Sequence, residues 1–315
     1  MAANQSRSSY RSRPGARVFP PYRSRVDLHS HSSRSDGVLE PAELVAQAAA
    51  AGVKVLALSD HDTLAGVREL RAPGSQPLPL ELLAAVEINS VATGMGELWE
   101  GELHILGLGV DVDDAAFEAA LERQRGLRVG RFRLIVDRLR DLGSPIDEQV
   151  ERYLATSGAV AGAAFGRPQI ARCLVAAGHA SSVDDAMQRL LARGRPAYVP
   201  RDGLGPVAAI EAIRAAGGVA SLAHFADAPQ RRDLVAELQE HGLGGLEVHY
   251  RHFPAETIVA LEALAVAMRL LPTGGSDYHG DGETYSEAHA TLFVPDADAS
   301  ALYAELQRPN PAGLG

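Results

Sequence analysis

Histidine and carboxylate residues recur along this chain at spacings that suit metal binding. The first run, VDLHSHSSRSDG at 26–37, contains His29, His31 and Asp36. Alternate residues of an extended chain point to the same face, so His29 and His31 are spaced to bind one cation. A solvent-facing histidine pair at the end of a strand would show the same spacing. The rest of the chain must decide between these interpretations.

Further candidate ligands follow, or lie within, apolar runs that predict β-strands: His61, Glu87, His104, His224, Asp277 and His279. In a closed barrel of βα units, the strand ends meet on the face that carries the active site. Without cations, the three carboxylates gathered there would repel one another and raise each other's pKa. The complete set therefore predicts a polynuclear metal site. His179, His241 and His289 lie in ordinary polar or helical surroundings and are expected at the surface.

The elements that would position these residues alternate between strand and helix. Strands are predicted at 53–59, 82–88, 102–110, 219–222, 245–249, 270–273 and 290–294, and helices at 40–52, 206–216, 254–268 and from 298 onwards. Repeated βα units imply an α/β fold with a mostly parallel sheet. Between 113 and 192 the patterns are helical without a strand, which predicts a helical insertion.

This organisation predicts four parts. They are a disordered Arg/Ser-rich leader at 1–24, a discontinuous barrel at 25–111 and 203–300, a helical insertion at 112–202 that covers the active site, and a C-terminal helix end and tail at 301–315.

Composition limits the classes of function. The 315 residues carry a net charge of −10, and the first 25 contain six arginines and no acid, so the remainder is more acidic still. An acidic body argues against tight nonspecific binding of long nucleic acid. Cys173 is the only cysteine, which excludes an intrachain disulfide framework. No apolar run approaches the roughly 18 residues of a membrane span, so we expect a cytoplasmic protein with no membrane association and no obligate protein partner.

Several short motifs occur together in a familiar order. DLHSHSSRSDG, LSDHDT, AVEIN, HILGLGV, AH and GGSDYHG resemble those of the polymerase and histidinol phosphatase (PHP) family of metal-dependent phosphoesterases, within the wider amidohydrolase group. The resemblance covers about residues 25–295. It implies a distorted (β/α)7 TIM-like barrel of the PHP type with a helical insertion, holding two or three divalent metal ions.

The resemblance also implies a role for each ligand. It places His29, His31, Glu87 and Asp277 on a first metal, Glu87 as a bridge to a second metal held by His104 and His224, and Asp36, His61 and His279 on a third. Glu87, His224 and Asp277 would also be catalytic. Asp60 and Asp62 flank His61 and would orient its imidazole, unless they serve only the turn at the strand end. This donor set suits Mn²⁺, Zn²⁺ or Fe²⁺, and Mg²⁺ is possible.

Hydrolysis of a phosphate ester is the chemistry that such a centre predicts. Two metals can share a water, lower its pKa to give a bridging hydroxide, and clamp the attacking and leaving oxygens. The sequence contains no G-x-S-x-G elbow, no GK[ST] loop and no dinucleotide fingerprint after a strand.

The insertion suggests the substrate. GRPQIAR at 166–172 and GRPAYV at 194–199 resemble the insert of the family branch that hydrolyses 3′,5′-bisphosphonucleotides and short RNA 5′ ends. Candidate substrate-binding residues are Arg167, Arg195, His249 and His252, for each of which a structural role remains open. The expected activity is removal of the 3′-phosphate from a nucleoside 3′,5′-bisphosphate. The alternatives are 5′-3′ exonuclease action on short RNA oligonucleotides and a noncatalytic metal- and nucleotide-binding module.

Overall fold

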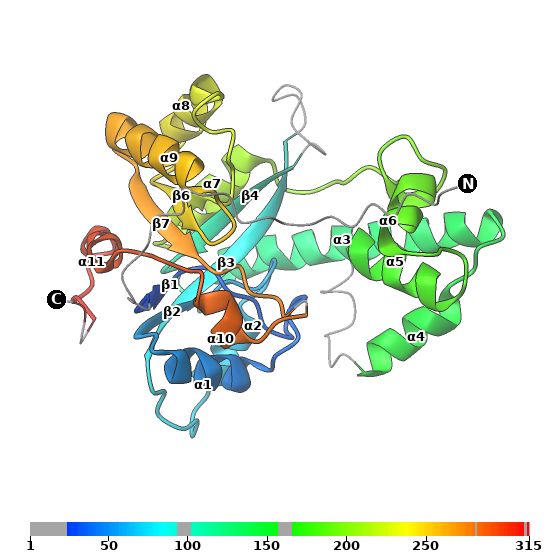
Figure 1. Ribbon diagram of the computed structural model, residues 1–315, viewed down its shortest axis with the longest axis horizontal. Helices are drawn as coiled ribbons and strands as arrows, with labels where there is room; N and C mark the ends of the chain where they lie inside the picture. The colour runs from blue at the N-terminus through cyan, green and yellow to red at the C-terminus, as the bar shows by residue number, and fades with distance from the viewer. Residues whose placement is uncertain (1–23, 93–101, 157–165, 281, 312–313, 315) are drawn as a thin grey trace, which may run out of the picture.

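A single sheet of seven strands organises the molecule (Figure 1). The structure is a computed structural model that describes residues 24–92, 102–156, 166–280, 282–311 and 314. In the order in which they pair, the strands are β1 (Val26–Asp27), β2 (Val55–Leu58), β3 (Glu81–Val91), β4 (Glu102–Leu108), β5 (Val219–Leu222), β6 (Gly245–Tyr250) and β7 (Leu271–Gly275). All neighbours are parallel except β4, which is antiparallel to both β3 and β5.

Backbone contacts between β1 and β7 bring the two edges of the sheet together. The Leu28 N–H donates to the Gly274 carbonyl over 3.0 Å, and Ser30 pairs with Tyr278 in an isolated parallel bridge. The sheet is therefore nearly closed into a barrel, as predicted.

The reversed direction of β4 decides where His104 lies. The parallel strands bring their carboxyl ends to one rim, whereas an antiparallel strand brings its amino end there. His104 is the third residue of β4 and stands opposite Asn89, two residues beyond Glu87 on β3. A residue near the start of a strand thus joins residues at the ends of others.

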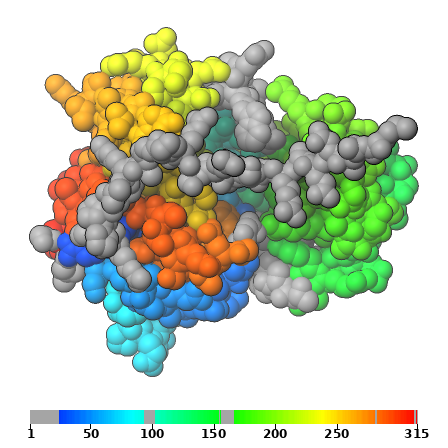
Figure 2. Space-filling model, in the orientation of Figure 1, coloured from blue at the N-terminus to red at the C-terminus, as the bar shows by residue number. Residues whose placement is uncertain are grey.

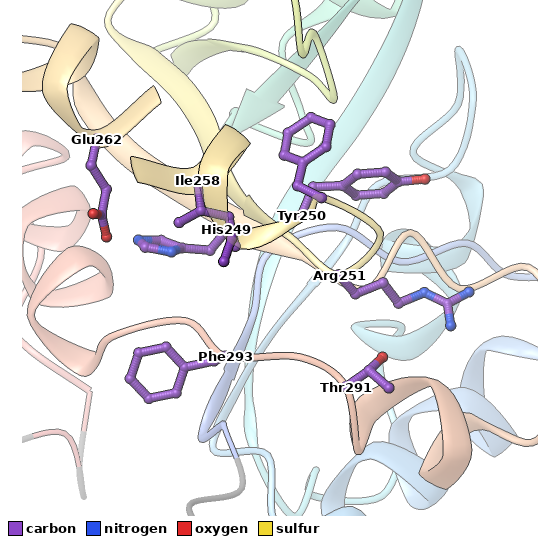
Figure 3. Close-up of a pocket in the computed structure, with 9 residues that line it drawn as sticks. His249, Tyr250, Arg251, Ile258, Glu262, Thr291 and Phe293 are labelled. Carbon is purple, nitrogen blue, oxygen red and sulfur yellow. The ribbon is translucent and has the colours of Figure 1, made fainter. Parts of the chain in front are cut away.

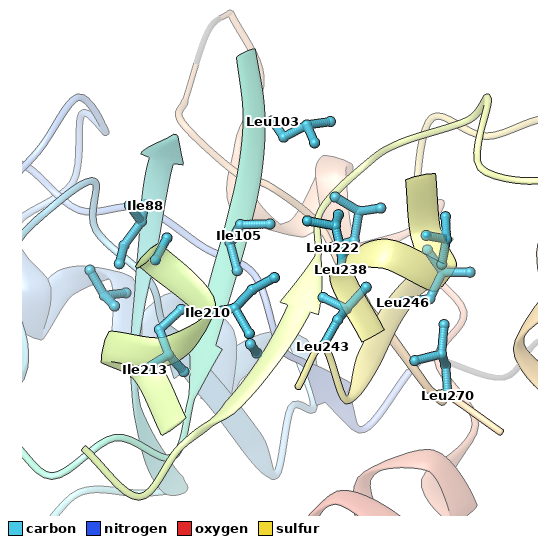
Figure 4. Packing of buried hydrophobic residues seen from close by; sticks show 14 of the residues in the cluster. Ile88, Leu103, Ile105, Ile210, Ile213, Leu222, Leu238, Leu243, Leu246 and Leu270 are labelled. Carbon is cyan, nitrogen blue, oxygen red and sulfur yellow. The ribbon is translucent and has the colours of Figure 1, made fainter. Parts of the chain in front are cut away.

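Helices surround the barrel and also form a separate lobe. Those packed around the sheet are α1 (Pro41–Ala51), α2 (Ala65–Leu70), α7 (Pro206–Ala215), α8 (Arg232–Glu240), α9 (Ala255–Met268), α10 (Tyr285–His289) and α11 (Asp296–Glu305). Pro41 at the first position of α1 and Gly52 after its end, at φ 103°, set the limits of that helix as predicted. Figure 4 shows apolar side chains of β3 to β6 packed against α7 and α8.

Most of the chain between β4 and α7 forms the lobe seen in green in Figure 2. It contains α3 (Ala115–Asp141), α4 (Asp147–Thr156), α5 (Arg167–Ala176), α6 (Val183–Ala186) and a π-helical turn, η2 (Met187–Leu191). These helices share a hydrophobic cluster that includes Ile135, Leu139, Ile170 and the buried Cys173. The limits predicted for this insertion, 112–202, stay a prediction, and the predicted leader lies outside the described residues except for Ser24.

Two expectations about the C-terminal part are wrong. Residues 290–294 form no strand, because β1 and β7 already pair and leave no edge for another; Leu292 and Val294 pack in the core instead. The helix α10, which precedes them, was not predicted. His289 lies in it and is buried rather than exposed, with its Nε2–H donating to the Ser24 carbonyl over 2.7 Å. Among the described residues, no helix is long and apolar enough to cross a membrane.

Candidate metal centre

The nine side chains predicted to bind metal lie in three overlapping groups at the barrel rim. In each group the candidate ligand atoms all lie within 4.8 Å of one another. The first group is His29, His31, Glu87 and Asp277, and the second group is Glu87, His104 and His224. The third group is His31, Asp36, His61 and His279. The structure thus brings together every predicted ligand. It also places His31 within the third group as well as the first, a proximity that the sequence did not indicate.

The first group has the spacing of a coordination sphere. The Nε2 atoms of His29 and His31 are 3.1 Å apart, and each lies 3.2 Å from Asp277 Oδ1 and 3.2–3.3 Å from Glu87 Oε2. Ligands bound tetrahedrally at about 2.0–2.1 Å from a zinc ion would be separated by about 3.3 Å. The side chains therefore need little movement to hold one cation.

Glu87 faces two groups with its two carboxylate oxygens. Oε2 is directed at the first group, whereas Oε1 lies 2.7 Å from His104 Nδ1 and 3.1 Å from His224 Nε2. The side chain is buried at the centre of the rim. This arrangement fits a carboxylate that bridges two cations.

Several polar atoms of these groups are buried without a hydrogen-bond partner. They are His31 Nδ1, His61 Nδ1, Glu87 Oε2 and Asp277 Oδ1. Buried polar atoms in native proteins are nearly always satisfied. Imidazole nitrogens and carboxylate oxygens directed at common points fit divalent metal ions, which would satisfy these atoms.

Without metal, protons balance the charges of the centre. Burial alone would raise the pKa of Glu87, but His61, His104 and His29 lower it well below its usual range. Burial lowers the pKa of His104, whereas Glu87 and Glu102 raise it, to about 9 overall. A cation that binds here takes the place of these protons.

Glu247, which the sequence analysis missed, positions ligands of the first and second groups. This fully buried carboxylate of β6 accepts a hydrogen bond from His29 Nδ1 (2.9 Å) and another from the His224 backbone N–H (2.6 Å). Donation from Nδ1 leaves Nε2 of His29 free to bind a cation. The only sequence signal was one acid within the apolar run 245–249.

Backbone strain is concentrated at the centre. Asp62, His224 and Asp277 adopt positive φ angles of 55°, 30° and 48°, which cost roughly 1–3 kcal/mol each for residues other than glycine. Hydrogen bonds from their amides hold them: Asp62 donates to the Glu87 carbonyl (3.0 Å), His224 to Glu247 and Asp277 to the His29 carbonyl (2.7 Å). The strain therefore serves to present these side chains.

A buried carboxylate joins the two loops that carry first-group ligands. Asp27 Oδ1 accepts from the Ser276 N–H (2.9 Å), and Oδ2 accepts from the Ser276 hydroxyl and the Tyr285 hydroxyl, each at 2.7 Å. Because Ser276 precedes Asp277, Asp27 fixes the GGSDYH loop against β1. Helix α10 supplies the tyrosine of this contact.

Asp60 and Asp62 make contacts other than the predicted ones. Asp60 accepts hydrogen bonds from the Ser32 amide and hydroxyl (2.7 Å each) and from the Ser35 hydroxyl (2.8 Å), so it shapes the loop that ends in Asp36. Asp62 forms an ion pair with Arg128 of α3. Orientation of His61 by either carboxylate stays a prediction.

A cluster of arginines lies beside the second group. Arg201 Nε is 2.9 Å and Arg167 Nη2 is 3.6 Å from Glu102 Oε1, while the other oxygen of Glu102 is 3.9 Å from His104 Nε2. Burial, with Arg201 and Arg167 nearby, lowers the pKa of Arg131 to about 10. Arg131, Arg167 and Arg201 therefore gather positive charge close to Glu102.

A small pocket, the arginine pocket, opens beside Arg131 and Arg201. Its lining residues are Asn89, Gln124, Arg128, Arg131, Arg201 and Asp202. The Asn89 side-chain oxygen is buried there without a hydrogen-bond partner. Arg167 is the one arginine of this cluster that the sequence indicated. Local patterns do not reveal the cluster, because α3, α5 and the segment before α7 contribute to it from distant parts of the chain.

The other predicted substrate residues are more scattered. Alternation along β6 would place His249 on the same face as Glu247, but the register shifts between them. His249 instead lines a cavity of about 190 Å³ on the outer side of the strand (Figure 3). Its Nε2 lies 2.9 Å from Asp298 of α11. His252 is exposed, and the centroid of its ring lies 5.3 Å from the ring centroid of Tyr250. The Tyr250 hydroxyl donates a hydrogen bond to Asp277 Oδ2 over 3.3 Å. Arg195 is exposed in a turn of the insertion.

Comparisons with known proteins agree with this geometry. Residues 27–191 match the PHP domain. The chain is 37% identical over 259 residues to the 5′-3′ exoribonuclease Rnm of Escherichia coli (strain K12), covering 80% of this chain and 84% of that protein. It is 30% identical over 286 residues to the 3′,5′-nucleoside bisphosphate phosphatase of Chromobacterium violaceum, covering 86% and 92%.

Solved structures are similar as well. A Bifidobacterium adolescentis protein assigned to the metal-dependent phosphoesterases aligns with a TM-score of 0.72 and 30% identity, over 89% of this chain and 95% of that one. An amidohydrolase from Chromobacterium violaceum aligns with a TM-score of 0.69 and 26% identity, over 86% and 98%. The chain therefore belongs to the PHP family, and it is a metal-dependent phosphoesterase.

Proposed function

We propose that this protein removes the 3′-phosphate of a nucleoside 3′,5′-bisphosphate, giving the 5′-nucleotide and phosphate. The observation that carries the proposal is the position of the arginine pocket, whose Arg201 is linked through Glu102 to His104 of the metal centre. A substrate with two phosphates can place one at each site. The similarity to the Chromobacterium violaceum bisphosphate phosphatase supports the same conclusion.

Two or three divalent cations would occupy these groups, with Mn²⁺, Zn²⁺ or Fe²⁺ preferred and Mg²⁺ possible. Bound there, they supply an activated water and neutralise the charge of the reacting phosphate. Glu87 would bridge the first and second groups, and Asp277 and His224 would complete the catalytic set. Glu247 keeps the Nδ1 proton of His29 in place, so that Nε2 faces the cation.

The arginine pocket would hold the phosphate that is not cleaved. Charge-assisted hydrogen bonds from guanidinium groups to phosphate are among the strongest in proteins. Arg131 and Arg201 line the pocket and offer such donors. Because Arg131 and Arg167 come from the helices between β4 and β5, we also propose that this insertion, 112–202, covers the active site.

Exonuclease action on short RNA with a 5′-phosphate is a second candidate. The 37% identity to the Escherichia coli exoribonuclease supports it, and the same arginine pocket could receive the terminal phosphate of an oligonucleotide. A noncatalytic module that binds metal and nucleotide is a third candidate, which predicts binding without turnover.

Phosphate release in the presence of Mn²⁺ separates these candidates. A nucleoside 3′,5′-bisphosphate, other phosphomonoesters and a labelled 5′-phosphorylated RNA should be compared, with Asp277→Ala as the inactive variant and Asp184→Ala, an exposed position in α6, as the matched control. We expect release from the bisphosphate and an RNA of unchanged length. A ladder of shortened RNA would favour the exonuclease, and no turnover above Asp277→Ala would leave only the binding module.

A further inference from the structure

Two arginines of α3 reach across to the loop that carries His61. Arg125 Nη1–H donates to the Asp62 backbone carbonyl over 2.8 Å, and Arg128 forms an ion pair with the Asp62 carboxylate. The two arginines are three positions apart, so they lie on one face of the helix. In Figure 1, α3 runs from the barrel into the helical lobe, so these contacts join the lobe to the barrel.

The backbone on either side of His61 is held by different parts of the molecule. On one side, Asp60 is bound to Ser32 and Ser35 of the first loop. On the other side, Asp62 has a positive φ of 55°. Its backbone N–H donates to the Glu87 carbonyl of β3, and its backbone carbonyl accepts from Arg125 of α3. Only the contacts with α3 come from outside the barrel.

His61 depends on this support for its position. Its Nδ1 lies 3.0 Å from Glu87 Oε2, and its Nε2 lies 3.5 Å from Asp36 Oδ2. A shift of the Asp62 backbone would move the imidazole away from the third group. The Asp62 side chain is fully buried and only 12% of the Arg128 side chain is exposed, so loss of Arg128 would leave a buried unpaired carboxylate, a strongly unfavourable state.

We propose that Arg125 and Arg128 are positioning residues for the third group: they hold Asp62 so that His61 can bind its cation. Docking of the helical insertion would thus be required for full metal occupancy. This inference rests on the proposed function, because it takes the third group as a cation site. It concerns residues that contact neither the reacting atoms nor the metal, although Arg128 also lines the arginine pocket.

Metal content tests the proposal independently of activity. The variants are Arg125→Gln, Arg128→Gln and the double variant Asp62→Asn/Arg128→Gln, which removes both charges and so leaves no buried unpaired one. Arg123→Gln, at an exposed position of the same helix, is the control. Bound Mn²⁺ per chain is counted by elemental analysis at several free Mn²⁺ concentrations, beside thermal unfolding.

We expect binding of one of the cations to weaken by about ten- to hundredfold in the variants, while the remaining cations and the control are unchanged. His61→Ala should lose the same cation. Adding Arg125→Gln to His61→Ala should then cause no further loss of metal, because both changes act at one site. A merely structural role would lower the unfolding temperature without this non-additivity.

The outcomes separate this inference from the proposed function. If folded Asp62→Asn/Arg128→Gln and Arg125→Gln proteins keep the full metal content of the unchanged protein, the inference is overturned. If the unchanged protein itself binds no Mn²⁺, the proposed metal centre fails first.

Discussion

Replacing Glu247 with glutamine should weaken cation binding at the first group without unfolding the barrel. The carboxylate accepts hydrogen bonds from His29 Nδ1 and from the His224 amide. Glutamine has nearly the same shape but only one accepting oxygen. If that oxygen faces His29, the amide NH₂ group faces the His224 N–H, and two donors then oppose each other.

The size of the effect follows from the bonds that change. A hydrogen bond to a charged group contributes about 1.5–3 kcal/mol, whereas a neutral one contributes about 0.5–1.5 kcal/mol. Loss of charge at the His29 bond alone therefore costs about 1–2 kcal/mol, which corresponds to roughly 5- to 30-fold weaker binding. In the opposite amide orientation, the His29 proton would move to Nε2 and block the metal-binding nitrogen.

Competition with a chromophoric chelator measures this loss directly. Glu237→Gln, at an exposed position of α8, is the matched control. We expect the Glu247→Gln protein to lose affinity for one cation by the factor above, with a similar loss in kcat/KM and a similar unfolding temperature. Unchanged metal affinity in a folded Glu247→Gln protein would refute the role assigned to this carboxylate.

Further predictions concern the arginine pocket, the metal-free state and α10. Arg131→Gln should raise KM for a bisphosphate by about tenfold or more, since about 1.5–3 kcal/mol of a charge-assisted bond is lost, and should leave KM for a monophosphate unchanged in steady-state assays. In the metal-free protein, Glu87 acts against burial to raise the pKa of His104 to about 9, and Asp36 similarly raises that of His279 to about 10. The stabilisation of the fold by these two protonated histidines is complete below about pH 6.5 and is lost as pH rises through 9–10. After chelation, the unfolding temperature should therefore fall progressively across this pH range. An unfolding temperature that does not change with pH would contradict the assignment. Tyr285→Phe removes one donor from the buried Asp27 carboxylate and should lower the free energy of unfolding by about 1–3 kcal/mol in denaturant titrations.

Local sequence patterns indicated most of the side chains that the structure gathers at the barrel rim. The alternation of His29 and His31 survives in the structure because the backbone there is hydrogen-bonded to the loop after β7, at Asp277 and Tyr278. His104 also lies with the other candidate ligands, although no local pattern indicated that β4 runs antiparallel.

The unpredicted features depend on contacts between distant segments. Glu247 is one acid in an apolar strand, and its partner His29 lies 218 residues away. The outward turn of His249 comes from a register shift, which periodicity cannot reveal. The arginine pocket and the contact of Arg128 with Asp62 require the insertion to dock on the barrel, and that geometry has no local signature.

Product analysis after incubation of the metal-loaded protein with a nucleoside 3′,5′-bisphosphate tests the central claim most directly. We predict equimolar formation of the 5′-nucleotide and inorganic phosphate, abolished both by chelation and by Asp277→Ala. Formation of the 3′-nucleotide, or phosphate release that persists in the Asp277→Ala protein, would contradict the account.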